Sequence, residues 1–442
     1  APMPSYIIRS MRKMFSHCLK LSYKDTAQQN SYVTIPQAAN SFDNTEIAAN
    51  VDEDIIDSLT GGRLVGSVTS FENFAECPLR YYLRYGVDLK EREEFTFSPV
   101  NFGVVLHAVI REVCDEIKKN GESYYLISDE KRREMVKRSV AAITDIYQNS
   151  ILKDSSRNSF MIKRMEDLAD RTVWAMGEQL KCGDFVPFVF EHKFNMEVGD
   201  GDRKQLMSGT IDRVDICENG TDVYVRIIDY KTGKKDFNIV KTYYGIDIQL
   251  MVYMEAAMKL VAKMRPGKNV IPAGVFYYNI SDPIVSATTE SAEEIEDKIK
   301  GELRLKGMVN SDKDIAEKMD NTEGTSLNIP VSRKADGGFD SRRSKVMNTE
   351  QFNMLGRFVD VRAVDTADRI AGGDIRRSPY KDGQFSSCDR CPYGAVCGFS
   401  VDLPGCNYRK LKKFDDEVLW NNIEEGVDEN GKKMDTGAEE RD

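Results

Sequence analysis

Asp212, Asp229 and Lys231 have the residue types that metal-assisted hydrolysis needs, and they lie within one short stretch. Mg²⁺ usually binds one or two carboxylates together with water and phosphate oxygens. A bound metal polarises a phosphate and lowers the pKa of its water, and a lysine can stabilise the developing negative charge. The combination suits phosphodiester hydrolysis. Asp-x-Lys alone is not specific, because the chain has several such pairs, but only the pair at Asp229 ends an apolar strand.

These side chains meet only if residues 208–231 fold as a β-hairpin. Both halves of the stretch are rich in alternating apolar and β-branched residues, and Asn219-Gly220 between them is a strong turn signal. A turn centred there places Asp212 opposite Ile227, and Asp229 follows two residues later on the same face. A bulge of one residue would break this parity. The alternative is a hairpin whose charged ends lie on a solvated face.

Size and composition predict a globular protein with two or three domains and a sizeable core. No apolar run approaches the length of a membrane span, and no signal peptide opens the sequence, so we expect no membrane partner. Nine cysteines without a secretory signal favour reduced thiols in a cytoplasmic protein over a disulfide framework. Because the sequence begins with Ala1 and not with Met, we expect a fragment of a longer protein.

The net charge of −10 argues against a generally basic nucleic-acid binder, but the charge is unevenly distributed. Residues 414–442 contain eleven acidic and three basic residues, a net of −8, so the rest of the chain carries about −2. Basic clusters within that remainder can follow a phosphate backbone. Each cluster taken alone is as often a solvated face.

The order of the expected elements predicts an α/β protein, a mixed sheet flanked by helices. A short amphipathic helix is expected at 5–21, followed by a polar linker at 25–60. Segment 281–348 has the character of an insertion in the sheet-forming region. The remaining expected helices cover residues 101–119, 128–150, 157–182, 247–264 and 349–372, and the strands outside the hairpin cover 186–198 and 272–280.

Further candidate residues lie on these elements. A capping box at Thr69–Glu72 opens a helix that Pro78 kinks, and Cys77 at the kink reads by itself as a small buried hydrophobe. His107 lies on an apolar helix face, where a lone histidine is more often packed in a core than bound to a metal. Glu191 on the strand at 186–198 faces either the hairpin site or solvent, with equal weight.

Gln249 and Tyr253 are four residues apart and therefore share one helix face. Both side chains can hydrogen-bond a nucleotide or a catalytic group. The plainer interpretation is a half-exposed polar stripe on that helix.

A cysteine cluster near the C-terminus has the spacing of a metal site. Cys388, Cys391 and Cys397 form C-x₂-C-x₅-C, and a C-x₂-C pair brings two thiolates onto one ion or cluster. Three ligands leave a fourth to be found. Cys406 as the fourth would indicate a zinc knuckle, and the distant Cys77 would indicate an iron–sulfur cluster that joins the two ends of a domain. The spacing does not choose between them.

Six motifs in a fixed order carry a family resemblance. They are S-F-E-N-F-A-E-C-P-L-R-Y-Y-L-R-Y, F-G-V-V-L-H, G-T-I-D-R-V-D, I-D-Y-K-T-G, Q-L-M-V-Y and C-D-R-C-P-Y-G-A-V-C, spread over residues 67–397. With them the chain resembles the C-terminal nuclease region of the AddB family, subunits of the bacterial AddAB helicase–nucleases within the RecB-like branch of the PD-(D/E)XK superfamily. The chain departs from a complete AddB protein in its length and in lacking a G-x-x-x-x-G-K-[ST] phosphate loop.

The resemblance implies a PD-(D/E)XK fold and a Mg²⁺-dependent DNA exonuclease. Such an enzyme cuts the strand that a partner helicase of the AddA type unwinds, during double-strand break repair by homologous recombination. The implied magnesium ligands are His107, Asp212, Asp229 and the carbonyl of Tyr230, with Lys231 as the catalytic lysine and Gln249 and Tyr253 supporting the site or the DNA. The implied ligands of a structural 4Fe–4S cluster are Cys77, Cys388, Cys391 and Cys397, which leaves Cys406 spare.

The implied organisation has four parts. Residues 1–60 are the tail of a helicase-like region or a linker, and 61–182 are a helical block with Cys77 and His107. Residues 183–400 are the nuclease core with the insertion, and 401–442 are a basic-then-acidic tail, disordered at its end. The alternatives are a free-standing exonuclease of the CRISPR-associated type and a non-catalytic DNA-binding scaffold module. The intact aspartate and lysine set speaks against the scaffold.

Overall fold

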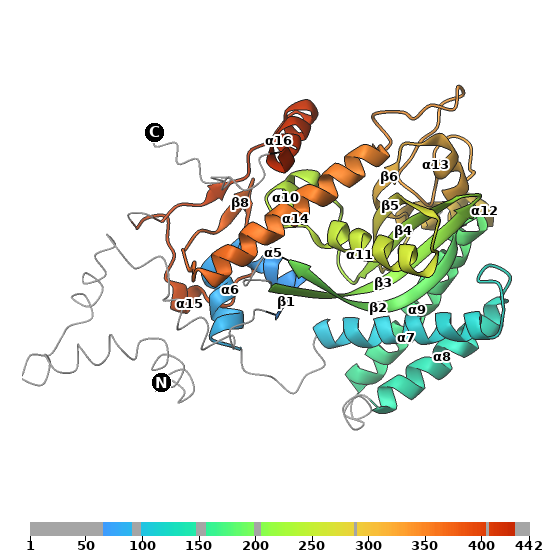
Figure 1. The fold of residues 1–442 in the computed structure, drawn as a ribbon. Helices are drawn as coiled ribbons and strands as arrows, with labels where there is room; N and C mark the ends of the chain where they lie inside the picture. Colours follow the sequence, from blue (N-terminus) through green and yellow to red (C-terminus); the bar gives the residue numbers. More distant parts are fainter. Residues whose placement is uncertain are drawn as a thin grey trace, which may run out of the picture.

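A long hairpin forms the centre of a mixed β-sheet in the computed structural model (Figure 1). The structure describes residues 65–90, 99–146, 156–198, 205–286, 290–403 and 406–428, so the expected helix at 5–21, the linker at 25–60 and the end of the acidic tail lie outside the described residues. The hairpin consists of β3 (Gln205–Asn219) and β4 (Asp222–Lys231). It coincides with the stretch that the sequence marks for chemistry.

Within the described residues, the central sheet has seven strands in the order β1-β3-β4-β5-β6-β7, and β2 pairs along β3. Strand β3 runs antiparallel to both β2 and β4, whereas β4 and β5 run parallel to each other. The predicted mixed sheet is therefore confirmed. The remaining strands are β1 (Val65–Ser67), β2 (Val186–Val198), β5 (Asn269–Asn279), β6 (Lys306–Asn310) and β7 (Val346–Met347).

Helices cover both faces of this sheet, as Figure 1 shows. On one face lie α7 (Pro99–Lys119), α8 (Asp129–Ile146) and α9 (Ser156–Lys181). On the other lie α5 (Val68–Glu76), α11 (Gln249–Met264), α14 (Thr349–Ala371) and α16 (Asp416–Asp428). The sequence predicts α7, α8, α9, α11 and α14 to within a few residues. Among the described helices, none is long and apolar enough to cross a lipid bilayer.

Strand β4 separates two hydrophobic cores. Val225 and Ile227 pack into the core beneath α11 and α14, and Tyr224 and Ile228 pack into the core beneath α7 and α9. Because alternate side chains of a strand point to opposite faces, a strand between two helical layers must be apolar on both. Burying each such side chain stabilises the fold by about 1.5–3 kcal/mol.

The register of the hairpin differs from the prediction by two residues. The turn residues are Gly220 and Thr221, so Asn219 pairs with Asp222, and Ile227 lies opposite Val214 and not opposite Asp212. Gly220 adopts the positive φ of 60° that the turn needs, whereas Asn219 stays in the ladder. Moving a turn by one position moves the pairing by two residues, a shift that by itself leaves each side chain on its face of the sheet.

The first described helix begins differently from the prediction. Ser67 is the N-cap of α5, since its Oγ accepts from the N–H of Ser70 at 3.2 Å. The predicted capping box at Thr69–Glu72 is therefore wrong. The kink at Pro78 is present: α5 ends at Glu76, Cys77 is extended, and α6 (Pro78–Tyr81) and a π-helical turn, η1 (Tyr82–Gly86), follow.

Segment 281–348 extends the sheet instead of standing apart from it. It contains α12 (Ala292–Glu302), β6, α13 (Lys313–Met319) and β7, and β6 pairs antiparallel with β5. After α14, the cysteine segment forms a small sheet of β8 (Tyr380–Asp382), β9 (Phe385–Ser386) and β10 (Arg409–Lys410), with the short helix α15 (Gly394–Cys397). Helix α16 then packs on α14 through Leu419 and Ile423.

Candidate metal-dependent active site

Asp212 and Asp229 lie side by side where the β3–β4 ladder ends. The last pair of the ladder is Arg213 with Ile228, and the two aspartates occupy the next position on each strand. The backbone N–H of Tyr230 donates to Asp212 Oδ2 at 2.7 Å, which ties the two strands together at this point. The hairpin therefore brings the two carboxylates to one place, although through a different register from the expected one.

The strands bend away from regular geometry at this end. Ile211 and Val214 are three residues apart, yet both side chains pack into the same core, so the alternation of β3 is interrupted around Asp212. On the neighbouring strand β2, Glu191 has a positive φ of 49°, which is uncommon for a residue other than glycine. Unusual backbone of this kind is often found at functional sites, where it re-aims side chains.

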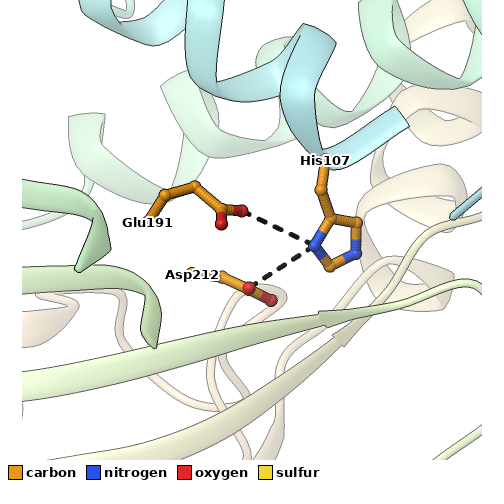
Figure 2. Close-up of side chains that lie close together, drawn as sticks. All are labelled: His107, Glu191 and Asp212. Carbon is orange, nitrogen blue, oxygen red and sulfur yellow. Dashed lines mark ion pairs between the residues drawn. The ribbon is translucent and has the colours of Figure 1, made fainter. Parts of the chain in front are cut away.

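A histidine from the helical layer completes a compact donor set. His107 on α7 places its Nδ1 3.4 Å from Asp212 Oδ1 and 3.7 Å from Glu191 Oε1, as Figure 2 shows. Among the described residues, these are the only three His, Cys, Asp or Glu side chains whose ligand atoms lie within 4.8 Å of one another. Burial lowers the pKa of His107, but hydrogen bonds to Asp212 and Glu191 outweigh it and raise that pKa to about 10.

The second aspartate is held by the lysine that follows it. Asp229 is buried, and its Oδ2 lies 2.6 Å from Lys231 Nζ without accepting a well-aligned hydrogen bond. Burial and the neighbouring charge of Asp212 raise the pKa of Asp229 to about 6, against the opposing charge of Lys231. The charges of Asp212 and Asp229 repel each other, although Asp229 does not belong to the set of ligand atoms within 4.8 Å of one another, and a divalent cation at the site would relieve that repulsion.

Lys231 is oriented by the helix behind it. Its Nζ donates to Gln249 Oε1 at 2.9 Å, and Gln249 Nε2 donates to the hydroxyl of Tyr253 at 2.9 Å. Gln249 and Tyr253 are buried, so their bonds are shielded from competing water. The structure thus joins the predicted helix pair to the lysine directly.

A buried ion cluster supports the strands beneath the site. Asp215 receives hydrogen bonds from Arg213 at 2.6 and 2.7 Å and from Arg226 at 2.9 Å, and all three side chains are almost fully buried. Breaking one partner of such a cluster leaves an unpaired buried charge, which costs about 3–5 kcal/mol. The cluster holds Arg213, and with it the adjacent Asp212, in one position.

Four cysteines meet at a separate place, beside the kink after α5. Cys77, Cys388, Cys391 and Cys397 line one small cavity, and Cys406 is not among its lining residues. Burial raises the pKa of the thiols of Cys77 and Cys397. The thiolates that metal ligation requires are therefore costly here unless a bound cation offsets the cost. We call these four residues the four-cysteine site.

Comparison with known proteins agrees with this geometry. The model of the PD-(D/E)XK nuclease superfamily matches residues 66–398, which span both sites. The chain belongs to the PD-(D/E)XK nuclease superfamily. Within this superfamily it is similar to an ATP-dependent helicase/deoxyribonuclease subunit of Clostridium acetobutylicum, with 35% identity over 383 residues, 84% of this chain and 33% of the relative.

Two further relatives carry the same name. The Caldanaerobacter subterraneus protein is 34% identical over 395 residues, 87% of this chain and 34% of its own length. The Lachnoclostridium phytofermentans protein is 33% identical over 399 residues, 88% of this chain and 34% of its own length. The chain thus spans about a third of the length of the curated relatives it matches.

Sequence reasoning missed part of this PD-(D/E)XK site. Glu72 is buried, and its Oε1 accepts from the backbone N–H groups of Ile248 and Gln249. Beside it, Asp247 lies 3.0 Å from Lys235 Nζ and accepts from the Tyr277 hydroxyl at 2.6 Å. No local pattern could reveal contacts across such separations in sequence. For Glu191 the sequence favours neither the hairpin site nor solvent, and in the structure its side chain points toward His107.

Proposed function

We propose that this chain is the nuclease module of a helicase–nuclease, a Mg²⁺-dependent deoxyribonuclease that hydrolyses phosphodiester bonds of unwound DNA. The observation that carries the proposal is the meeting of Asp212, Asp229 and Lys231 with His107 at the end of one hairpin. Membership of the PD-(D/E)XK superfamily and the name of the relatives, helicase/deoxyribonuclease, support the same activity.

The side chains suit a hard divalent cation. Carboxylate oxygens of Asp212, Asp229 and Glu191 with one imidazole nitrogen of His107 are a donor set for Mg²⁺ or Mn²⁺. The carbonyl of Tyr230 is a further proposed ligand. When bound, the ion supplies a Lewis acid that polarises the scissile phosphate and acidifies the attacking water.

The remaining residues orient the reaction. Lys231, fixed by Gln249, presents its ammonium beside the carboxylates, where it stabilises charge that develops on the phosphate. Tyr253 keeps the amide of Gln249 turned so that its oxygen faces the lysine. Because these groups are held before the substrate arrives, little reorganisation is needed during the reaction.

The four-cysteine site is proposed to hold a 4Fe–4S cluster with a structural role. Sγ atoms around one tetrahedral zinc ion lie about 3.8 Å apart, given Zn–S bonds of about 2.3 Å. No three cysteine Sγ atoms of the described residues lie within 4.8 Å of one another, although four cysteines line one cavity. This wider spacing supports a cluster over a single zinc ion. A bound cluster would join Cys77 to the segment 388–397.

The partners follow from the same proposal. The relatives are named as one subunit of a helicase/deoxyribonuclease, a name that implies a second subunit. We therefore propose a helicase of the AddA type as the partner and the strand that it unwinds, during double-strand break repair, as the substrate.

Anaerobic purification, metal analysis and a DNA cleavage assay test the proposal together. We expect cleavage of single-stranded DNA that requires Mg²⁺ and stops when EDTA is added, and a protein that contains about four iron atoms. Purified protein that cleaves equally well in EDTA, or not at all with Mg²⁺ and Mn²⁺, would contradict the nuclease assignment. Stoichiometric zinc in place of iron would contradict the cluster.

A further inference from the structure

The N-terminus of α11 is capped by a carboxylate from a distant helix. The residue before α11 is Ile248, whose side chain has no oxygen to cap the helix. Glu72 Oε1 instead accepts from the N–H groups of Ile248 and Gln249, both at 3.0 Å. The first N–H groups of a helix have no partner inside it, and a carboxylate there is also stabilised by the helix dipole. Glu72 therefore fixes where α11 begins.

That beginning is part of the active site. Gln249 is the first residue of α11, and its side chain accepts from Lys231 Nζ. Any displacement of this backbone moves the amide that orients the lysine. A misplacement of about 1 Å can reduce a reaction rate by about a hundredfold. A single residue, Gln249, thus connects the contact between Glu72 and α11 to the catalytic lysine.

The C-terminal end of α5, the helix that carries Glu72, reaches the four-cysteine site. Glu72 lies on α5, which ends at Glu76, and Cys77 follows with its N–H bonded to the carbonyl of Asn73 at 3.1 Å. Arg409, beyond the C-terminal cysteines, donates to the carbonyls of Ala75 and Glu76. The last turn of α5 is therefore held by the cysteine segment.

We propose that Glu72 is a positioning residue that couples the four-cysteine site to Lys231 through the rigid helix α5. The proposal rests on the nuclease function above and adds a link between its two sites. Cross-linking of Cys77 to the C-terminal cysteines fixes α5 along its axis. Glu72 then holds the first turn of α11, and Gln249 holds Lys231 in place for reaction.

The surroundings of Glu72 agree with a role in hydrogen bonding. Burial raises the pKa of Glu72 to about 7, against the opposing charge of Lys235. A buried carboxylate is costly unless it is hydrogen-bonded. The two backbone N–H groups supply these hydrogen bonds to Glu72. The side-chain amide of a glutamine at position 72 could accept from them as well.

Steady-state kinetics of three variants test the proposal. Glu72→Ala should lower kcat by about a hundredfold with KM within about twofold and with the iron content unchanged. Glu72→Gln should stay within about tenfold of the wild-type kcat, because a neutral acceptor forms hydrogen bonds at about half strength. Thr69→Ala, at an exposed position of the same helix α5, is the control and should behave as wild type.

Amide hydrogen exchange gives a readout that does not depend on activity. The amides of Ile248 and Gln249 should exchange at least about tenfold faster in Glu72→Ala than in wild type, because both lose their hydrogen bond to the carboxylate. Removal of the iron of the four-cysteine site with a chelator should accelerate exchange of the same two amides in wild type. Exchange of the amides of α7 should stay unchanged.

The outcomes separate this proposal from the proposed function. Normal kcat in Glu72→Ala, or slow exchange at Ile248 and Gln249 after metal removal, would overturn the coupling while wild-type cleavage stands. If wild type itself shows no Mg²⁺-dependent cleavage, the nuclease function fails, and the exchange data alone then decide whether Glu72 holds α11 under the control of the four-cysteine site.

Discussion

The N–H of Tyr230 bonds to Asp212 Oδ2 at 2.7 Å, so the residue after one candidate metal ligand is anchored to the other. This bond fixes the separation of Asp212 and Asp229 whether or not a metal is bound. The energetic cost of keeping the two carboxylates together appears in the raised pKa of Asp229, to which burial and then the charge of Asp212 contribute. A site that holds two carboxylates together against their repulsion is built for a cation.

Replacement of Asp229 tests this arrangement. We expect Asp229→Ala to lower Mg²⁺-dependent DNA cleavage by at least about a thousandfold, because loss of one group that stabilises a transition state costs about 10²–10³ in rate, and a metal ligand is lost as well. The fold should remain intact, as far-UV circular dichroism and iron content would show.

The matched control lies at the other end of the same strand. Asp222 is half-buried beside the turn, where it pairs with Asn269 and contacts no residue of the site. Asp222→Ala should cleave DNA as wild type does. Full activity in purified, folded Asp229→Ala would remove this aspartate from the mechanism.

The helix that orients the lysine gives a graded prediction. Gln249→Ala removes the acceptor of Lys231, so we expect kcat to fall by about 10–100-fold. Tyr253→Phe removes only the bond that orients Gln249, so its effect should be under about tenfold. Single-turnover cleavage at saturating DNA measures both rates.

Lys263→Ala, on an exposed position of the same helix, serves as the control and should leave the rate unchanged. The order of the two active-site effects is the critical result. A larger loss in Tyr253→Phe than in Gln249→Ala would mean that the tyrosine contacts the DNA or the reacting groups itself.

The sequence predicts the faces of the hairpin better than its register. Asn219-Gly220 is a turn signal, but the structure uses Gly220 and Thr221 because only one residue needs the positive φ that glycine allows. Alternation of apolar residues has a period of two, so it constrains the face of each side chain in the regular part of the hairpin. It predicts neither the pairing partner of each residue nor the interruption around Asp212.

Contacts between distant segments escape sequence reasoning for a different reason. Glu72 reads as part of a local capping box, since Thr69 precedes it by three residues, but its carboxylate bonds to backbone 176 residues away. Helix α16 reads as part of an acidic tail, because its two buried anchors, Leu419 and Ile423, are outnumbered by acidic residues. Such elements become visible only when the partner surface is known.

Two buried cysteines near the C-terminal segment should differ in their effect on metal content. Cys77→Ala should lose the iron and the broad absorbance near ~400 nm that thiolate-ligated clusters show, and it should destabilise the protein. Cys406→Ala should retain both, because Cys406 does not line the four-cysteine site. Iron analysis and visible spectra of anaerobically purified protein provide the measurement.

Each variant serves as the control of the other, since both remove a buried thiol. Loss of iron in Cys406→Ala with retention in Cys77→Ala would assign the fourth ligand to the local cysteine. That result would favour a metal site confined to the C-terminal segment and would remove the connection to α5.

Asp360 on α14 should make the stability of the protein depend on pH. Burial, followed by a hydrogen bond to Glu255 and the charge of that residue, raises the pKa of Asp360 from 3.8 to about 8, and Lys259 opposes this only in part. The folded protein therefore binds this proton more tightly than the unfolded chain does. Its contribution to stability is complete below about pH 4 and is lost as the pH rises through about 8.

Asp360→Asn removes this dependence, because an amide donates to Glu255 at every pH. The melting temperature of the variant relative to wild type should rise between pH 6 and pH 9, by about 1 °C for each kcal/mol of lost repulsion in a chain of this length. Asp368→Asn, at an exposed position of α14, should show no such trend. A constant difference between Asp360→Asn and wild type across this range, measured by thermal unfolding in EDTA, would show that Asp360 and Glu255 do not share a proton.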